Sequence, residues 1–210
     1  MTDREEPTSN DAQTSTPEAI PTPELTALTH PAEGVPSVVT DTTGLAEVIA
    51  ALTQGTGPIA IDAERAGGYR YSHSAYLVQL RRTGSGSHLI DPIGFTDLAP
   101  LAEVIADEEW ILHAASQDLP CLAELQMLPS RLFDTEMAAR ILGRPKVGLA
   151  ALAESELGVS LAKEHSAADW STRPLPEAWL RYATLDVELL IELRSILAED
   201  LESTGRMPWA

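Results

Sequence analysis

The sequence contains one cysteine, Cys121, and few basic residues. A single cysteine excludes an internal disulfide and a zinc site built from several thiolates. Because Cys121 lies in an apolar stretch with helical periodicity, we expect it to pack in the core. The 14 lysines and arginines face 32 acidic residues, which gives a net charge of −18. This charge excludes a broad basic face that binds nucleic acid by charge alone, but it leaves open an acidic, metal-lined cleft that takes in one chain end.

The sequence also lacks a long apolar run, since no stretch approaches the roughly 20 residues of a membrane-spanning helix. The first residues, Met1 to Glu6, carry neither the basic nor the apolar region of a secretion signal. We therefore expect a cytoplasmic protein with no membrane contact. The chain contains no sequence repeat and no long amphipathic seam, so we expect a monomer.

Residues 1–34 are poor in large apolar side chains and rich in Thr, Ser, Pro, Asp and Glu. Such a segment cannot bury enough surface to offset its conformational entropy, so we expect it to be a disordered acidic tail. The rest of the chain has the apolar content of one globular domain, which we place at residues 35–203. We expect residues 204–210 to form a C-terminal tail.

The apolar periodicity of residues 35–203 predicts strands that alternate with helices. Strands are expected at 35–39, 59–64, 75–80, 88–90, 110–113 and 132–134. Helices are expected at 42–53, capped by Thr42 or Thr43, and at 98–106, 116–127 and 176–201, with shorter helical pieces between 135 and 175. A Gly-Ser-Gly turn joins the strands at 75–80 and 88–90 into an antiparallel hairpin. This order predicts an α/β domain with a mixed sheet of five to six strands flanked by helices.

The strand at 59–64 is apolar except for Asp62 and Glu64. Because side chains alternate along a strand, these two carboxylates point to the same face. Two adjacent carboxylates at the end of a buried strand repel each other unless a cation compensates them, and their oxygens suit magnesium or manganese. The alternative is that the strand emerges into water at this point.

Two further acidic residues fall where they can join such a site. Asp118 lies in the first turn of the helix that follows the strand at 110–113, where the helix dipole favours a carboxylate. Tyr182 and Asp186 are four residues apart on the last helix and therefore share a face. Taken singly, Asp118 is better explained as a common helix-start acid, and the Tyr182–Asp186 pair as a solvated edge of the last helix. Only the whole set indicates a metal-dependent site.

In chain order, these residues form the pattern of the DEDD 3′–5′ exonucleases, in the subgroup whose third motif is Tyr-x-x-x-Asp. Within that group the chain resembles the catalytic domain of the ribonuclease D family from about residue 36 to residue 201. The resemblance is carried by Ile61–Glu64, Ala75–Leu80, Leu89–Pro92, His113–Leu119 and Phe133–Thr135. Its most specific segment is Ser166–Leu175, which reads SAADWSTRPL and precedes the last helix.

The resemblance implies a ribonuclease H-like fold and hydrolysis of phosphodiester bonds with two divalent metal ions, magnesium or manganese. It implies that Asp62 bridges both ions, that Glu64 and Asp186 complete the shell of one, and that Asp118 holds the other through water. It assigns to Tyr182 the orientation of the attacking water. The expected substrate is RNA with a single-stranded or overhanging 3′ end, in the processing of transfer RNA or other stable RNAs, and the expected product is a nucleoside 5′-monophosphate.

Further residues are expected to contact substrate, and they are Gln79, His113, Lys163 and Arg173. For Arg173 the alternative is an ion pair with Asp169. For His113 the alternative is that it packs in the core or supports the metal ligands without contacting substrate. Asp134 matches a position of the family pattern, but we expect it to cap or position the helix that follows it. We expect Trp170 to pack in the core.

Two other functions stay open. The same acids serve a 3′–5′ exonuclease that acts on DNA, because discrimination rests on contacts to the 2′-hydroxyl. The second is a catalytically silent domain that binds RNA or protein. The loss of one of the acids would favour it, but all of them are present. The ribonuclease D family continues into one or two small helical RNA-binding domains. This chain is therefore either a lone exonuclease domain or a fragment, in which residues 204–210 begin the missing helical domain.

Overall fold

The computed structural model describes residues 25–71, 74–161, 165 and 167–210. Its centre is a six-stranded sheet with the order β2-β5-β4-β3-β6-β7. The strands are β2 (Val38–Val39), β3 (Thr56–Arg65), β4 (Ala75–Thr83), β5 (Gly86–Ile90), β6 (Glu109–Leu112) and β7 (Arg131–Asp134). Strand β4 runs antiparallel to β3 and β5, whereas β2–β5, β3–β6 and β6–β7 are parallel pairs. The predicted mixed sheet is confirmed, with six strands.

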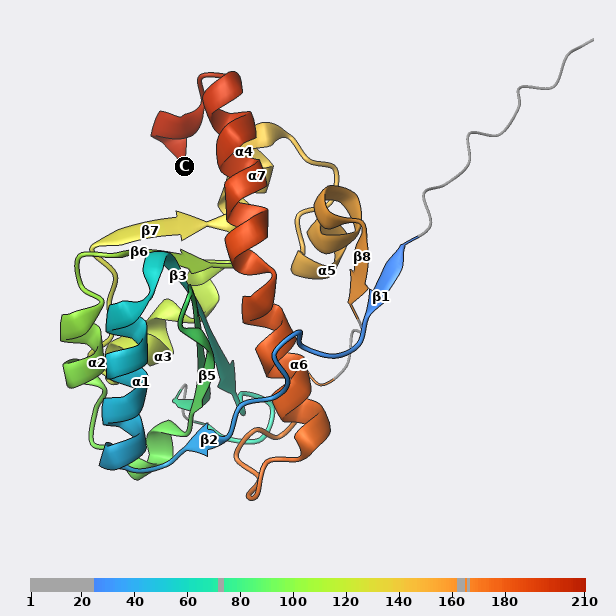
Figure 1. The fold of residues 1–210 in the computed structure, drawn as a ribbon. Coiled ribbons are helices and arrows are strands. Elements are labelled where there is room, and N and C mark those ends of the chain that lie inside the picture. The colour runs from blue at the N-terminus through green and yellow to red at the C-terminus, as the bar shows by residue number, and fades with distance from the viewer. Residues whose placement is uncertain (1–24, 72–73, 162–164, 166) are drawn as a thin grey trace, which may run out of the picture.

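Helices cover both faces of this sheet (Figure 1). One face packs against α1 (Thr42–Gln54), α2 (Ala99–Val104) and α3 (Leu119–Glu124), in a core that includes Ile59, Ile61 and, as predicted, Cys121. The other face packs against α6 (Glu177–Glu188) and α7 (Leu190–Ser203), where Ala60 of β3 meets Val187 and Leu190. The alternation of β3 side chains between these two cores follows from the period of two along a strand. The residues of β3 that follow Ala60 at this period therefore face α6.

Two sequence-based boundaries are corrected. The last helix, expected as one piece at 176–201, consists of α6 and α7 joined at Leu189, which keeps helical backbone angles (φ −82°, ψ −21°). The cap of α1 is Asp41 rather than Thr42 or Thr43, because the Asp41 carboxylate accepts a hydrogen bond from Gly44 N at 2.9 Å. No helix in the described part of the chain is long and apolar enough to cross a membrane.

A separate two-stranded sheet pairs β1 (Thr26–Leu28) in parallel with β8 (Val159–Leu161). The prediction that disorder extends to residue 34 is therefore wrong for residues 26–28, while residues 1–24 lie outside the described residues. The pairing uses backbone groups, and two of the three β1 side chains are exposed, so no apolar pattern in the sequence indicates it.

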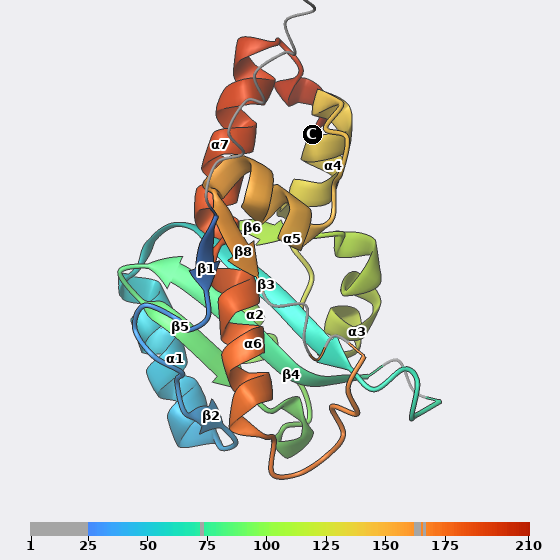
Figure 2. The same cartoon turned by 90° about the vertical axis from the view of Figure 1, so that its right-hand side faces the viewer.

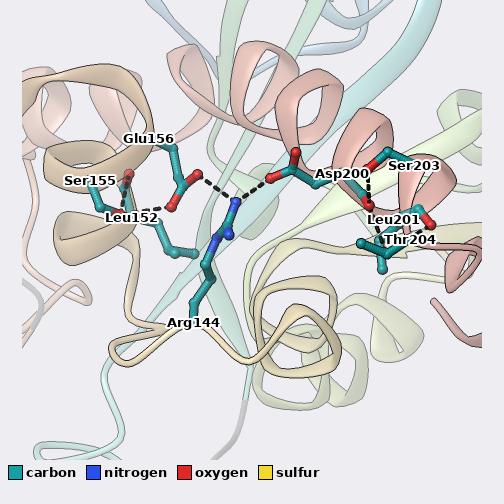
Figure 3. A network of polar contacts seen from close by, with 8 residues as sticks. All are labelled: Arg144, Leu152, Ser155, Glu156, Asp200, Leu201, Ser203 and Thr204. Carbon is teal, nitrogen blue, oxygen red and sulfur yellow. Dashed lines mark hydrogen bonds and ion pairs between the residues drawn. The ribbon is translucent and has the colours of Figure 1, made fainter.

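In a third cluster of apolar side chains, α7 packs on α4 (Thr135–Leu142) and on the π-helical turn Ala153–Leu157. Leu149 and Leu152 of α5 (Leu149–Leu152) belong to the same cluster. Arg144, in the loop after α4, lies between Glu156 and Asp200 (Figure 3). Its guanidinium lies 2.9 Å from Glu156 Oε2 and also contacts the Asp200 carboxylate on α7. Arg144 thus ties three segments that are distant in sequence.

We predict that Arg144→Ala destabilises the fold, because it leaves the poorly exposed Glu156 without its cation. The expected loss is about 1–3 kcal/mol, or a fall in Tm of roughly 3–10 °C in thermal unfolding. The matched control is Arg131→Ala, since Arg131 is well exposed and lies 4.0 Å from Glu109, and it should change stability by less than about 0.5 kcal/mol. Equal Tm values for the two variants would contradict this role of Arg144.

Candidate active site

Asp62 and Glu64 lie at the C-terminal half of β3, on the face that α6 covers. Asp186 comes from α6 itself. One carboxylate oxygen from each of the three residues lies within 4.8 Å of the others. The alternation along β3 and the packing of α6 on the sheet thus bring together three of the four acids that the sequence singled out.

Burial and mutual repulsion dominate the electrostatics of this group. Burial raises the pKa of Asp62 to about 6, although the Ala63 N–H and the Arg65 charge oppose the shift. The pKa values of Glu64 and Asp186 lie well above their usual range, first because of burial and second because of the negative Asp62 beside them. A divalent cation would turn this repulsion into attraction, and three carboxylates are ligands of the kind that magnesium and manganese prefer. The three side chains fit such an ion.

Asp118 faces the same cleft from the start of α3, but it is not one of the three acids within 4.8 Å. Its carboxylate accepts no hydrogen bond from the helix backbone. Burial, then the charge of Asp62, raises the pKa of Asp118 to about 8. The cleft has a volume of about 320 Å³ and is lined by residues from β3, from the turn that leads into α3, from the start of α5 and from α6. Figure 2 shows how these elements are arranged. All four acids line the cleft.

Arg65 is a site residue that the sequence reading missed. Its Nη2 atom lies 3.8 Å from Asp118 Oδ1, and among the described residues lining the cleft it is the one cation. Strict alternation would place Arg65 on the face opposite to Glu64. The pairing of β3 with β4 shifts register between these two residues, where Tyr76 of β4 has no partner on β3, so the regular ladder that strict alternation assumes is interrupted at this point. In the sequence, the only indication that Arg65 belongs to the site is its position next to Glu64.

Asp134 holds the loop that carries Asp118. It caps α4, with Oδ1 accepting from Glu136 N at 2.9 Å and from Met137 N at 3.2 Å. The same carboxylate accepts from Ala114 N at 3.1 Å and Ala115 N at 2.9 Å, in the turn after β6. Ala114 has a left-handed backbone with φ 57°, which these bonds help to hold. The predicted capping and positioning role of Asp134 is confirmed.

Tyr182 lies one helical turn before Asp186 and forms a side-chain hydrogen bond with it. Burial, then the charges of Asp186 and Glu64, raises the pKa of the Tyr182 phenol well above its usual value. The phenol is therefore protonated at neutral pH and acts as a hydrogen-bond donor rather than as a base.

The predicted substrate contacts have different outcomes. His113 lines the cleft. Gln79 lies opposite Asp62 on β4 but is fully buried, is absent from the described lining of the cleft, and has no hydrogen-bond partner within the described part of the chain. Lys163 lies outside the described residues. Trp170 is fully buried, as expected for a core residue.

Arg173 has a structural role that differs from both predictions. All five of its N–H groups are committed within the protein, which leaves none for a substrate phosphate. Two bind the Asp91 carboxylate, with Nε–Oδ2 at 2.6 Å and Nη2–Oδ1 at 2.9 Å. The other three donate to the carbonyl oxygens of Trp170, Thr172 and Tyr76. The predicted ion pair with Asp169 is wrong, because the partner is Asp91, 82 residues away.

Residues 36–202 match the model of the 3′–5′ exonuclease family, and the chain belongs to this family of nuclease hydrolases. It is similar to ribonuclease D of Haemophilus influenzae, with 38% identity over 176 residues, which cover 82% of this chain and 43% of that protein. Ribonuclease D of Escherichia coli is 37% identical over 158 residues, which cover 72% of this chain and 41% of that protein.

Solved structures agree with this assignment. A protein from Bifidobacterium adolescentis superimposes with a TM-score of 0.85 at 48% identity, over 89% of this chain and 46% of the other. Escherichia coli ribonuclease D gives a TM-score of 0.72 at 34% identity, over 82% of this chain and 46% of the other. The expected ribonuclease H-like fold is confirmed. The chain spans less than half the length of these relatives.

We predict that the metal-free protein loses stability as pH rises from about 5 to about 8. Aspartates of an unfolded chain release their protons near pH 4, whereas the folded pKa values are about 6 for Asp62 and about 8 for Asp118. Between pH values near 4 and near 8, the unfolded chain binds fewer protons than the folded chain, so each rise in pH favours unfolding. In EDTA, Tm should fall over this range, with a smaller fall in Asp118→Asn, and magnesium should restore it at pH 8. A fall of equal size in both proteins would contradict the assignment.

We predict that Asp134→Ala costs about 2–4 kcal/mol of stability and impairs the site, since four backbone N–H groups lose their acceptor. The matched control is Asp41→Ala, which removes the cap of α1 away from the cleft and should cost about 1 kcal/mol. Thermal unfolding and magnesium titration of nuclease activity check both variants. Only Asp134→Ala should need more magnesium for half-maximal activity, and an unchanged requirement would refute the link to Asp118.

Proposed function

We propose that this chain is a 3′–5′ exoribonuclease domain that removes nucleoside 5′-monophosphates from RNA 3′ ends with two divalent metal ions. The observation that carries the proposal is the convergence of Asp62, Glu64 and Asp186 within 4.8 Å, beside Tyr182, in a member of the 3′–5′ exonuclease family. The choice of RNA is supported by the similarity to proteins named ribonuclease D. The Escherichia coli enzyme is described as an exoribonuclease involved in structured RNA processing.

The roles of the residues follow from their positions. Asp62, Glu64 and Asp186 would hold one ion, and Asp62 with Asp118 would hold the other. Such ions, when bound, stabilise negative charge on a phosphate and lower the pKa of water. Tyr182 keeps its proton and donates it to Asp186, so its oxygen can accept a hydrogen bond from a water beside Asp186 and orient it. Arg65 lies on the Asp118 side and lowers the negative potential that an incoming phosphate meets.

The biological setting is part of the proposal. We propose RNA with a single-stranded or overhanging 3′ end as the substrate, with processing of transfer RNA or another stable RNA as its context. In support, a Brucella melitensis protein named NrnC, 26% identical with a TM-score of 0.65, has been solved bound to pGG. A domain that only binds is disfavoured because all four acids and Tyr182 are retained. Monomeric state and cytoplasmic location stay predictions.

We predict that purified protein shortens a 5′-labelled RNA with a 3′ overhang in single-nucleotide steps, with magnesium or manganese and not with EDTA. Asp62→Asn should lower the rate on the order of 10³-fold, because bound ions contribute several kcal/mol to the transition state. The control Asp97→Asn alters an acid outside the cleft that accepts from Ala99 N, and it should keep full activity. No shortening with any divalent metal would refute the exonuclease, and equal loss in both variants would refute the site.

A further inference from the structure

His113 lines the same cleft as the acidic cluster of Asp62, Glu64 and Asp186. Strands β3 and β6 are parallel, and their ladder pairs Ala60 with Ile111. Strand β6 ends at Leu112, so His113 is the first residue after it, and the same register continued by two residues would bring it level with Asp62. Both residues are on the face that α6 covers, and both line the cleft.

The hydrogen bonds of His113 determine which of its ring nitrogens carries the proton. Nδ1 lies 2.9 Å from Thr135 Oγ1. The Thr135 hydroxyl donates its own proton to Leu112 O at 3.3 Å, so towards the ring it can only accept. We therefore assign the proton to Nδ1. Nε2, at the other end of the ring from Thr135, then carries a lone pair and is a hydrogen-bond acceptor.

Burial keeps this acceptor available. It lowers the pKa of His113, although the charges of Asp134 and Glu136 oppose the shift. The ring is therefore neutral at physiological pH. Among the described residues, the group that could hold a metal ion consists of Asp62, Glu64 and Asp186, and His113 is not part of it. Its lone pair is thus left for a hydrogen-bond donor that enters the cleft.

A nucleic acid strand offers few donors to such an acceptor. Phosphate and ring oxygens only accept, and base-edge donors differ from base to base, whereas an enzyme that removes successive nucleotides must accept every base. The sugar hydroxyls remain, and of these the 2′-hydroxyl is present in RNA and absent from DNA. We propose that His113 Nε2 accepts a hydrogen bond from a ribose 2′-hydroxyl near the scissile phosphate and thereby selects RNA over DNA. This inference rests on the proposed nuclease function.

The test compares RNA oligonucleotides that are identical except for one 2′-deoxy substitution, at the terminal or at the penultimate nucleotide. For the wild-type chain we expect kcat/KM to fall about tenfold at one of these positions, the size of one lost hydrogen bond. His113→Phe keeps a planar ring without an acceptor and should remove that preference, so that the variant cleaves the ribose and deoxyribose substrates at equal rates. His113→Gln restores an acceptor and should recover part of the preference.

Thr135→Val tests the assignment of the proton independently. It keeps the shape of the buried side chain but removes the acceptor for Nδ1–H, and the ribose preference should fall with it. Thermal unfolding of each variant separates this effect from loss of folding. Fluorescence anisotropy measures the affinity for the same oligonucleotides in the presence of calcium, and so detects the contact without hydrolysis.

The outcomes distinguish the two proposals. Equal loss of rate on both substrates in His113→Phe would overturn the 2′-hydroxyl contact, because it would indicate a structural role or a contact to the 3′-hydroxyl. Wild-type protein that treats ribose and deoxyribose alike, in cleavage or in binding, would overturn it as well. If no oligonucleotide is cleaved but the ribose end binds more tightly in a His113-dependent way, the exonuclease proposal fails and the contact stands.

Discussion

Repulsion among four carboxylates in one largely buried cleft is the constraint on which this structure depends. Asp62 and Glu64 are placed by the alternation of β3, Asp186 by the packing of α6, and Asp118 by the loop after β6. Their raised pKa values show that the fold holds these groups against an electrostatic cost, which ordinary apolar cores must offset. Divalent cations convert that cost into binding energy, since ligand charges already held in place need no further reorganisation.

The remainder of the structure keeps these groups in position. Asp134 fixes the loop of Asp118 through four backbone hydrogen bonds. Helix α6, which carries Tyr182 and Asp186, passes into α7 through a single residue, and α7 is anchored at its far end by Arg144 (Figures 1 and 3). Arg173 ties the segment before α6 to the end of β5 through Asp91. Hydrogen bonds and ion pairs outside the acidic cluster thus hold the elements that carry its residues.

Local periodicity in the sequence predicted the parts of the site that depend on one element. A period of two placed Asp62 and Glu64 on one face, and a spacing of four placed Tyr182 beside Asp186. Features that depend on how elements meet were not predictable in this way. The Arg65–Asp118 ion pair, the β1–β8 pairing and the Arg173–Asp91 ion pair join residues through tertiary geometry, which neither periodicity nor composition encodes.

The most direct test of the central claim is manganese binding to metal-free protein at about pH 8, measured by calorimetry or electron paramagnetic resonance. A carboxylate cluster that exists to hold divalent ions predicts saturable binding, weakened at least about tenfold in Asp186→Asn and unchanged in Asp97→Asn. Absence of saturable binding, or equal binding by the wild-type chain and Asp186→Asn, would contradict it.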